Sequence, residues 1–482
     1  MRERLAELMA YCLRLGADCA DIRVKTIDTE SVSLENSEIR GINSDRSVGY
    51  GIRVFLDGSA GFAAASDFDS MEKTAERAFK IAKASGMLQT RKIALTPKPV
   101  VVDDYATPVE IDPFTVPMSE KIALLMACEE AMGAVPGVTQ TSSSMDFRRE
   151  DVVYCDSDGS YITQKFCQSG GGISATAAGE HGAEARSYPC ANRGAHARAG
   201  YEYLLSLRLK EHAEEIARES VQLLNAPECP TGVYDLILDP GQMTMQIHES
   251  IGHPTELDRV LGYEAAYAGT SFVRAGDLRD GLAYGSPQVT VVADATVPGG
   301  LGTFGYDDEG VKAASTLLLD KGRLKNFTTS RDTAGQIGLL SNGACLADGW
   351  RHAPLVRMTN INLLPGAYEL DELIAGIEDG LMLSGTKSWS IDDKRINFQF
   401  ACEIACEIKN GKRTGRIFKN AIYSGITTQF WANCDGVANE KYWSMGGTPF
   451  CGKGQPDQTA RVGHGSSPTR FRKVKVGVGD AG

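Results

Sequence analysis

The segment VYDLILDPGQMTMQIHESIGHP (residues 233–254) joins a predicted strand, a turn and a predicted helix. The apolar run that ends at Leu238 is typical of a buried strand. The following residues predict a helix over residues 242–251, and Pro254 stops it, because a proline forces the residue before it out of the helical region. A helix that carries His248, with His253 just beyond its end, is therefore expected near the middle of the chain.

Short strand-like runs surround this helix and continue to the C-terminus, separated by Gly and Asp-Gly turns. Glycine supplies 52 of 482 residues, about 11%, against ~7% in average proteins. Such an excess favours many tight turns and a β-rich architecture over a helical bundle. The predicted fold class is α+β: an N-terminal α/β portion, followed by a β-rich C-terminal domain with one embedded motif helix.

Four segments are predicted along the chain. Residues 1–92 alternate helix-like and strand-like patterns and form an N-terminal α/β domain. Residues 93–118 are a connector without regular elements, because this stretch holds Pro97, Pro99, Pro108, Pro113 and Pro117. Residues 119–225 form a central domain that closes with one long amphipathic helix over residues 201–224. Residues 226–482 form the β-rich domain with the histidine-bearing helix.

Composition excludes several classes of protein. The chain has 50 basic and 62 acidic residues, a net charge of −12 and a pI near 5.2, so it lacks the positive charge of a nucleic-acid binder. No apolar run reaches the ~18 residues that span a bilayer, and the first residues have no signal-peptide pattern. Twelve cysteines are too dilute for a disulfide scaffold and are expected to be reduced. These features predict a cytoplasmic protein that binds neither nucleic acid nor membrane.

The spacing H-E-x-x-x-H of His248, Glu249 and His253 needs a special helix geometry. Zinc hydrolases use H-E-x-x-H, in which two imidazoles four residues apart share a helix face and the glutamate acts as base. A spacing of five would turn the two rings about 140° apart on a regular helix. Both rings reach one metal if Gly252 and Pro254 break the helix, or if a π-type turn widens it.

The residues alone leave two questions open. Both histidines could instead be hydrogen-bonded core groups. A catalytic zinc usually takes three protein ligands and keeps one position for water, and spacing does not choose the third. The candidates are nearby acids, distant histidines and loop cysteines: Glu256, Asp258, His352, His464, Cys434 and Cys451. Among them, Cys451 is noted for its glycine-rich surroundings, which let a thiolate approach an ion closely.

Four motifs carry a resemblance to a known family: HESIGHP (248–254), GYDDEG (305–310), RMTN (357–360) and CGK (451–453). Their order, with the N-terminal GADCADIR (16–23), resembles the TldD/PmbA metallopeptidases, also called modulators of DNA gyrase, over almost the whole length. The resemblance implies His248, His253 and Cys451 as ligands of one zinc ion per chain, with Glu249 as catalytic base. It also implies a TldD-like, catalytic member, because this chain keeps the motif that metal-less members have lost.

The predicted function is a zinc-dependent peptidase that hydrolyses small or unfolded peptides inside an enclosed dimeric cleft. By resemblance, the partner is a second copy or a metal-less PmbA-type paralogue. One alternative is a non-catalytic peptide-binding or regulatory subunit of a heterodimer, which an intact Glu249 disfavours. Another is a metal-dependent amidase that acts on a small molecule.

Two further signals receive no role from sequence. The acids Asp307, Asp308 and Glu309 stand between glycines, so we expect a solvated turn there. His464 lies in Gly-His-Gly, a pattern that is typical of an exposed loop.

Overall fold

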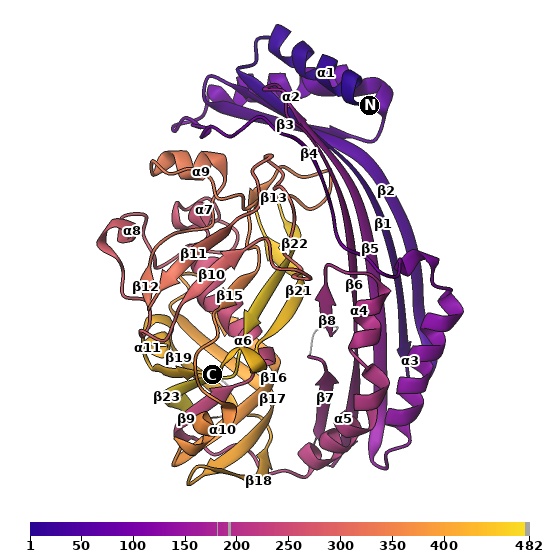
Figure 1. The fold of residues 1–482 in the computed structure, drawn as a ribbon, viewed down its shortest axis with the longest axis vertical. Coiled ribbons are helices and arrows are strands. Elements are labelled where there is room, and N and C mark those ends of the chain that lie inside the picture. The colour runs from indigo at the N-terminus through magenta and orange to yellow at the C-terminus, as the bar shows by residue number, and fades with distance from the viewer. Residues whose placement is uncertain (181, 191–193, 478–482) are drawn as a thin grey trace.

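The computed structural model describes residues 1–180, 182–190 and 194–477 and confirms the α+β class (Figure 1). Its helices are α1 (Arg2–Arg14), α2 (Met71–Gly86), α3 (Met118–Gly133), α4 (Tyr201–Ser206), α5 (Leu209–Leu224), α6 (Pro240–Ile247), α7 (Leu257–Val260), α8 (Asp277–Asp280), α9 (Arg331–Gln336), α10 (Leu370–Ala375) and α11 (Thr427–Ala432).

A long twisted sheet forms one side of the molecule (Figure 1). Its strands are β1 (Cys19–Glu35), β2 (Glu38–Leu56), β3 (Ser59–Ala65), β4 (Val102–Ala106), β5 (Val138–Asp156), β6 (Tyr161–Gly179), β7 (Gly182–Tyr188) and β8 (Ala195–Ala197). The order is β3-β2-β1-β5-β6-β4, and β7 and β8 also pair with β6. Because β1 pairs with β5, strands from residues 1–92 and 119–225 share one backbone ladder.

Two groups of helices cover the apolar surface of this sheet. Helices α1 and α2 bury their apolar faces against the start of β1 and the end of β2. Helices α3 and α5 lie along β5 and β6 (Figure 1). The long helix predicted over residues 201–224 is instead two helices, α4 and α5, interrupted at Arg208, which has a left-handed φ of 53°. The interruption agrees with the packing of the two helices: Leu204 of α4 packs in one core cluster and Leu209 of α5 packs in another.

The proline-rich stretch is not free of regular structure, which corrects the prediction for residues 93–118. Strand β4 lies in it and pairs in parallel with β6. The five residues of β4 contain no proline, so they keep the N–H groups that a ladder needs. The stretch is also fastened by Lys98, whose Nζ lies 2.6 Å from Asp156 Oδ2 and donates to Ser160 Oγ at 2.9 Å.

Replacing Lys98 with methionine should unpair a buried carboxylate. The Lys98 and Asp156 side chains are 2% and 5% exposed, and removing one partner of a buried pair costs about 3 kcal/mol. Although burial raises the pKa of Asp156, its bonds with Lys98 lower it below the usual value. The pair therefore stabilises the native state above the ordinary carboxyl pKa, and this contribution is lost as the pH falls through the lowered value.

We expect urea unfolding of Lys98→Met at neutral pH to show this loss, and the difference from the unmodified chain to shrink in acid. Lys80→Met is the control, because that side chain is 77% exposed. Equal stabilities of the two variants would contradict the anchoring role.

The C-terminal region contains the rest of the strands. They are β9 (Gly232–Leu238), β10 (Val291–Asp294), β11 (Ser315–Asp320), β12 (Arg323–Leu324), β13 (Cys345–Leu346), β14 (Leu355–Val356), β15 (Ile361–Leu363), β16 (Asp379–Ile391), β17 (Asn397–Lys409), β18 (Lys412–Phe418), β19 (Ile422–Ile426), β20 (Cys434–Val437), β21 (Ser444–Lys453), β22 (Gln458–Ser466) and β23 (Thr469–Val476). The largest sheet has the order β16-β9-β23-β19-β17-β18. Because β16 also pairs with β17, five of these strands close into a ring around an apolar core.

The acidic turn at 307–309 is buried, not solvated as predicted. Asp307, Asp308 and Glu309 are 1%, 6% and 2% exposed. Lys25 Nζ lies 3.1 Å from Asp308 Oδ1, and Arg53 Nη1 lies 3.0 Å from Glu309 Oε1. The cations come from β1 and β2, so local sequence gave no sign of them. These ion pairs join the first sheet to the C-terminal region.

Among the described residues, no helix combines the length and apolar character that crossing a membrane requires. All twelve cysteines are free thiols.

Candidate metal centre

The motif helix widens at the histidines. Asp239 caps α6 by accepting from the Gln242 N–H at 2.7 Å, and after Ile247 the chain continues as a π-helix over His248–Gly252. The N–H of His253 donates to the carbonyl of His248, five residues earlier. The two rings consequently lie 4.8 Å apart, centroid to centroid, and perpendicular. The structure thus adopts the second predicted solution, the π-type turn.

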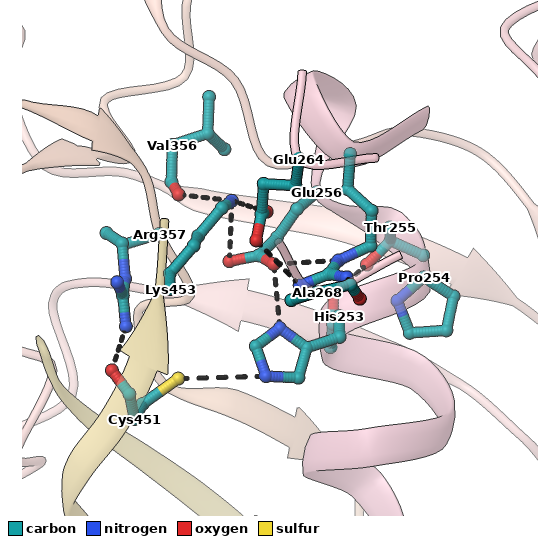
Figure 2. Close-up of polar contacts among 12 residues, drawn as sticks. His253, Pro254, Thr255, Glu256, Glu264, Ala268, Val356, Arg357, Cys451 and Lys453 are labelled. Atoms are coloured by element: carbon teal, nitrogen blue, oxygen red, sulfur yellow. Dashed lines mark hydrogen bonds and ion pairs between the residues drawn. The ribbon is translucent and has the colours of Figure 1, made fainter. Parts of the chain in front are cut away.

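Strand β21 brings Cys451 to these histidines. The possible ligand atoms of His248, His253 and Cys451 all lie within 4.8 Å of one another. The thiol Sγ is 3.8 Å from His253 Nε2 (Figure 2), and the three residues are 2–4% exposed. Of the other third-ligand candidates, His352 is elsewhere, where its Nδ1 contacts the Asp348 carbonyl. Cys434 lies on β20 and packs in the core.

Two residues behind the rings orient them. The Glu256 carboxylate accepts a hydrogen bond from His253 Nδ1 at 2.7 Å, so Nε2 keeps its lone pair toward Cys451. His464 Nε2 lies 2.8 Å from His248 Nδ1. This histidine is 1% exposed on β22, which corrects the prediction of an exposed loop. Glu256 and His464, two of the third-ligand candidates, thus contact the Nδ1 atoms of the two histidines and are not members of the His-His-Cys cluster.

A buried charge network supports Glu256 (Figure 2). Lys453 Nζ lies 3.3 Å from Glu256 Oε1, 2.8 Å from Asp258 Oδ1 and 3.2 Å from Glu264 Oε1. Although burial raises it, Lys453 and His253 hold the pKa of Glu256 well below its usual range. An ionised Glu256 is the form that accepts the hydrogen bond from His253 Nδ1. Asp258 is therefore a partner of Lys453 and not a member of the three-residue cluster.

The electrostatics of the cluster suit zinc. Burial lowers the pKa values of His248 and His253, which favours neutral rings. Burial alone would raise the pKa of the Cys451 thiol, yet Arg357 and His253 lower it below its usual value. Two neutral imidazoles and a thiolate are the donor forms that bind zinc. The residues present therefore fit a zinc ion, which His248, His253 and Cys451 would hold.

Glu249 lies beside this cluster and is held by two residues that sequence reasoning missed. Trp389 Nε1 donates to Glu249 Oε1 at 3.0 Å, and Arg395 Nη1 donates to Oε2 at 2.5 Å. All three side chains line a cavity of about 460 Å³ together with the His-His-Cys cluster. Trp389 and Arg395 come from the β16–β17 hairpin, about 140 residues downstream, and no local motif marks them.

This fold and cluster define a class: a large α+β protein with a buried cluster of two histidines and one cysteine that could hold a metal ion. Three family models match the chain: PmbA/TldA metallopeptidase domain 1 at residues 20–82, the central domain at 111–224 and the C-terminal domain at 231–478. Because these matches cover most of the sequence, the chain belongs to the PmbA/TldD metallopeptidase family.

Relatives agree with this membership, and two solved structures share the fold. A metalloprotease of Methanothermobacter thermautotrophicus is 31% identical over 95% of both chains. A zinc metalloprotease TldD homolog of Saccharolobus solfataricus is 29% identical over about half of each chain, 51% of this one and 52% of the relative. A solved Thermotoga maritima protein described as a modulator of DNA gyrase has a TM-score of 0.76 at 17% identity and covers 99% of this chain and 100% of its own. TldE from Thermococcus kodakarensis has a TM-score of 0.70 at 17% identity and covers 98% of this chain and 99% of its own. Both solved proteins share the fold of this chain.

Proposed function

We propose that the chain is a zinc-dependent peptidase that cleaves small or unfolded peptides. The observation that carries this proposal is the buried His248, His253 and Cys451 cluster with Glu249 lining the same cavity. Relatives named metalloproteases over 95% or more of both chains support it. A zinc ion held there would lower the pKa of its water and polarise the scissile carbonyl.

The side chains have distinct roles in this proposal. His248, His253 and Cys451 hold the ion, while Glu256 keeps the His253 lone pair directed at it. Glu249 takes the proton of the attacking water and passes it to the leaving amine. The cavity of about 460 Å³ falls in the usual range of small-ligand sites, roughly 300–1,000 Å³. A short extended segment fits such a volume, whereas a folded domain does not.

We further propose a dimeric, enclosed cleft in the cytoplasm, formed with a second copy or with a metal-less relative. The shared fold of the solved protein named TldE is compatible with such a pair. Enclosure would explain how a peptidase with little sequence selectivity spares folded proteins.

Metal analysis combined with a cleavage assay tests the proposed function. We expect about one zinc per chain, loss of cleavage with a chelator and recovery with added zinc. One substrate protein, offered in native and in denatured form, should be cut only when denatured. The assay is run on this chain alone and with a metal-less paralogue, and light scattering reports the assembly. A zinc-free, inactive chain would favour the non-catalytic subunit instead, and equal cleavage of both substrate forms would contradict the enclosure.

A further inference from the structure

The β16–β17 hairpin donates a hydrogen bond to each carboxylate oxygen of Glu249, the proposed base. Trp389 reaches Glu249 Oε1 from the end of β16, and Arg395 reaches Oε2 from the turn before β17. The Arg395 and Glu249 side chains are 12% and 9% exposed, so this ion pair is largely shielded from solvent. Both donors line the cavity of the His-His-Cys cluster, which places them where a substrate would bind.

The turn that carries Arg395 is fixed in shape. The Asp392 carboxylate accepts the N–H groups of Lys394 at 3.1 Å, Ile396 at 2.8 Å and Asn397 at 2.9 Å. Arg395 itself has a left-handed φ of 63°, a conformation that costs a non-glycine residue of order 1 kcal/mol. The fold thus maintains an unfavourable backbone geometry that delivers this guanidinium to the cavity.

Arg395 has hydrogen-bonding capacity beyond its bond to Glu249. Its buried Nε has no hydrogen-bond partner, and Nη2 lies 3.5 Å from the Ala268 carbonyl. Among the described residues that line the cavity, Arg395 is the one lysine or arginine. Burial lowers its pKa from the ordinary value even though Glu249 raises it. A desolvated cation at this position favours any state in which negative charge develops beside it.

We propose that Arg395 is a catalytic residue that stabilises the oxyanion of the scissile carbonyl, and that Trp389 is a positioning residue for Glu249. This inference rests on the proposed function. When the water oxygen bonds to the carbonyl carbon, the C=O π electrons move to the carbonyl oxygen and the proton moves to Glu249. The negative charge leaves Glu249 and appears on the substrate. Arg395 contacts Glu249 inside the cavity. It therefore pairs with the negative charge on Glu249 before the step and with the charge on the carbonyl oxygen after it.

The second half of the reaction reverses this transfer. The C–N bond breaks as the oxyanion re-forms the carbonyl, and Glu249 returns its proton to the amine nitrogen. Negative charge then resides on Glu249 again, where Arg395 and Trp389 already donate. Because donors fixed in place need no reorganisation during the reaction, their benefit appears in the transition state and therefore in kcat.

The test compares kcat, KM, bound zinc and thermal unfolding for Arg395→Met, Arg395→Lys, Trp389→Phe and the control Lys394→Met. Lys394 is exposed on the same turn and does not line the cavity. We expect Arg395→Met to lose about 100- to 1,000-fold in kcat, as when one oxyanion donor is removed. Its KM should stay within about threefold and its zinc content unchanged, whereas Trp389→Phe should lose less kcat.

A chemical rescue separates the oxyanion role from a structural one. Guanidinium ion at non-denaturing concentration should restore part of the kcat of Arg395→Ala, and sodium chloride of equal ionic strength should not. Absence of rescue, or a kcat of Arg395→Met equal to that of Lys394→Met, overturns the inference. Arg395→Lys keeps the positive charge and should lose less kcat than Arg395→Met. If the methionine and alanine variants fail to fold, Arg395→Gln takes their place, and an unchanged kcat in that uncharged variant overturns the inference. A wild-type chain that holds zinc and cleaves nothing overturns the proposed function itself.

Discussion

Glu249→Gln is expected to abolish peptide hydrolysis while zinc remains bound. An amide cannot accept the proton of the attacking water, so the loss should reach about 10³-fold or more in kcat. The metal should stay, because Glu249 lies outside the His-His-Cys cluster. The variant should also fold, since an amide oxygen still accepts from Arg395, although the amide nitrogen faces the Trp389 donor. That mismatch should cost about 1 kcal/mol.

Activity, zinc content and thermal unfolding are measured together on Glu249→Gln and on Glu440→Gln. The control makes the same chemical change on an exposed residue of the C-terminal region. Turnover at the wild-type rate in Glu249→Gln would overturn the mechanism. Loss of zinc along with activity would show that Glu249 has a structural role at the site.

The site residues that lie on the motif helix could be predicted from the local sequence. His248, Glu249 and His253 lie within six residues, and their spacing requires a π-type or broken helix if both rings are to reach one ion. A π-helix is present. Gly252 is explained by tertiary packing, since a Cβ there would lie 2.1 Å from Met358 Sδ. The α+β class was equally predictable, because turn-separated strand patterns and amphipathic helices are local features.

The remainder depends on contacts between distant segments. His464 and Arg395 reach the motif helix from separate hairpins, and no spacing rule links them to His248. The glycines on either side of His464 are typical of a loop in sequence. In the structure they lie on a strand, where Asn360 and Trp443 leave no room for a Cβ. Likewise, Asp308 is buried in a turn where Lys25 of the first sheet forms an ion pair with it. Pairwise charge compensation of this kind leaves no periodic pattern in the sequence.

Cys451→Ser should lose most of the bound zinc. The thiolate is the soft, charged donor of the proposed set, and Arg357 and His253 lower the pKa of Cys451 despite its burial. A serine hydroxyl does not ionise near neutral pH, so the cluster would keep two neutral ligands and lose its anion. Because binding to the native state stabilises it in proportion to RT ln(1 + [L]/Kd), added zinc should raise the Tm of the wild type and not that of the variant.

Cys434→Ser is the matched control for this experiment. Cys434 is also a buried, free thiol of the C-terminal region, but it packs on β20 away from the cluster. Placing a hydroxyl in the core should destabilise both variants, whereas zinc retention against a competing chelator should fall only in Cys451→Ser. Cys451→Asp, which restores an anionic donor, should recover part of the affinity. If Cys451→Ser and Cys434→Ser retained zinc equally, Cys451 would not be a ligand, and the third donor would have to be sought among the residues that now orient the rings, His464 and Glu256.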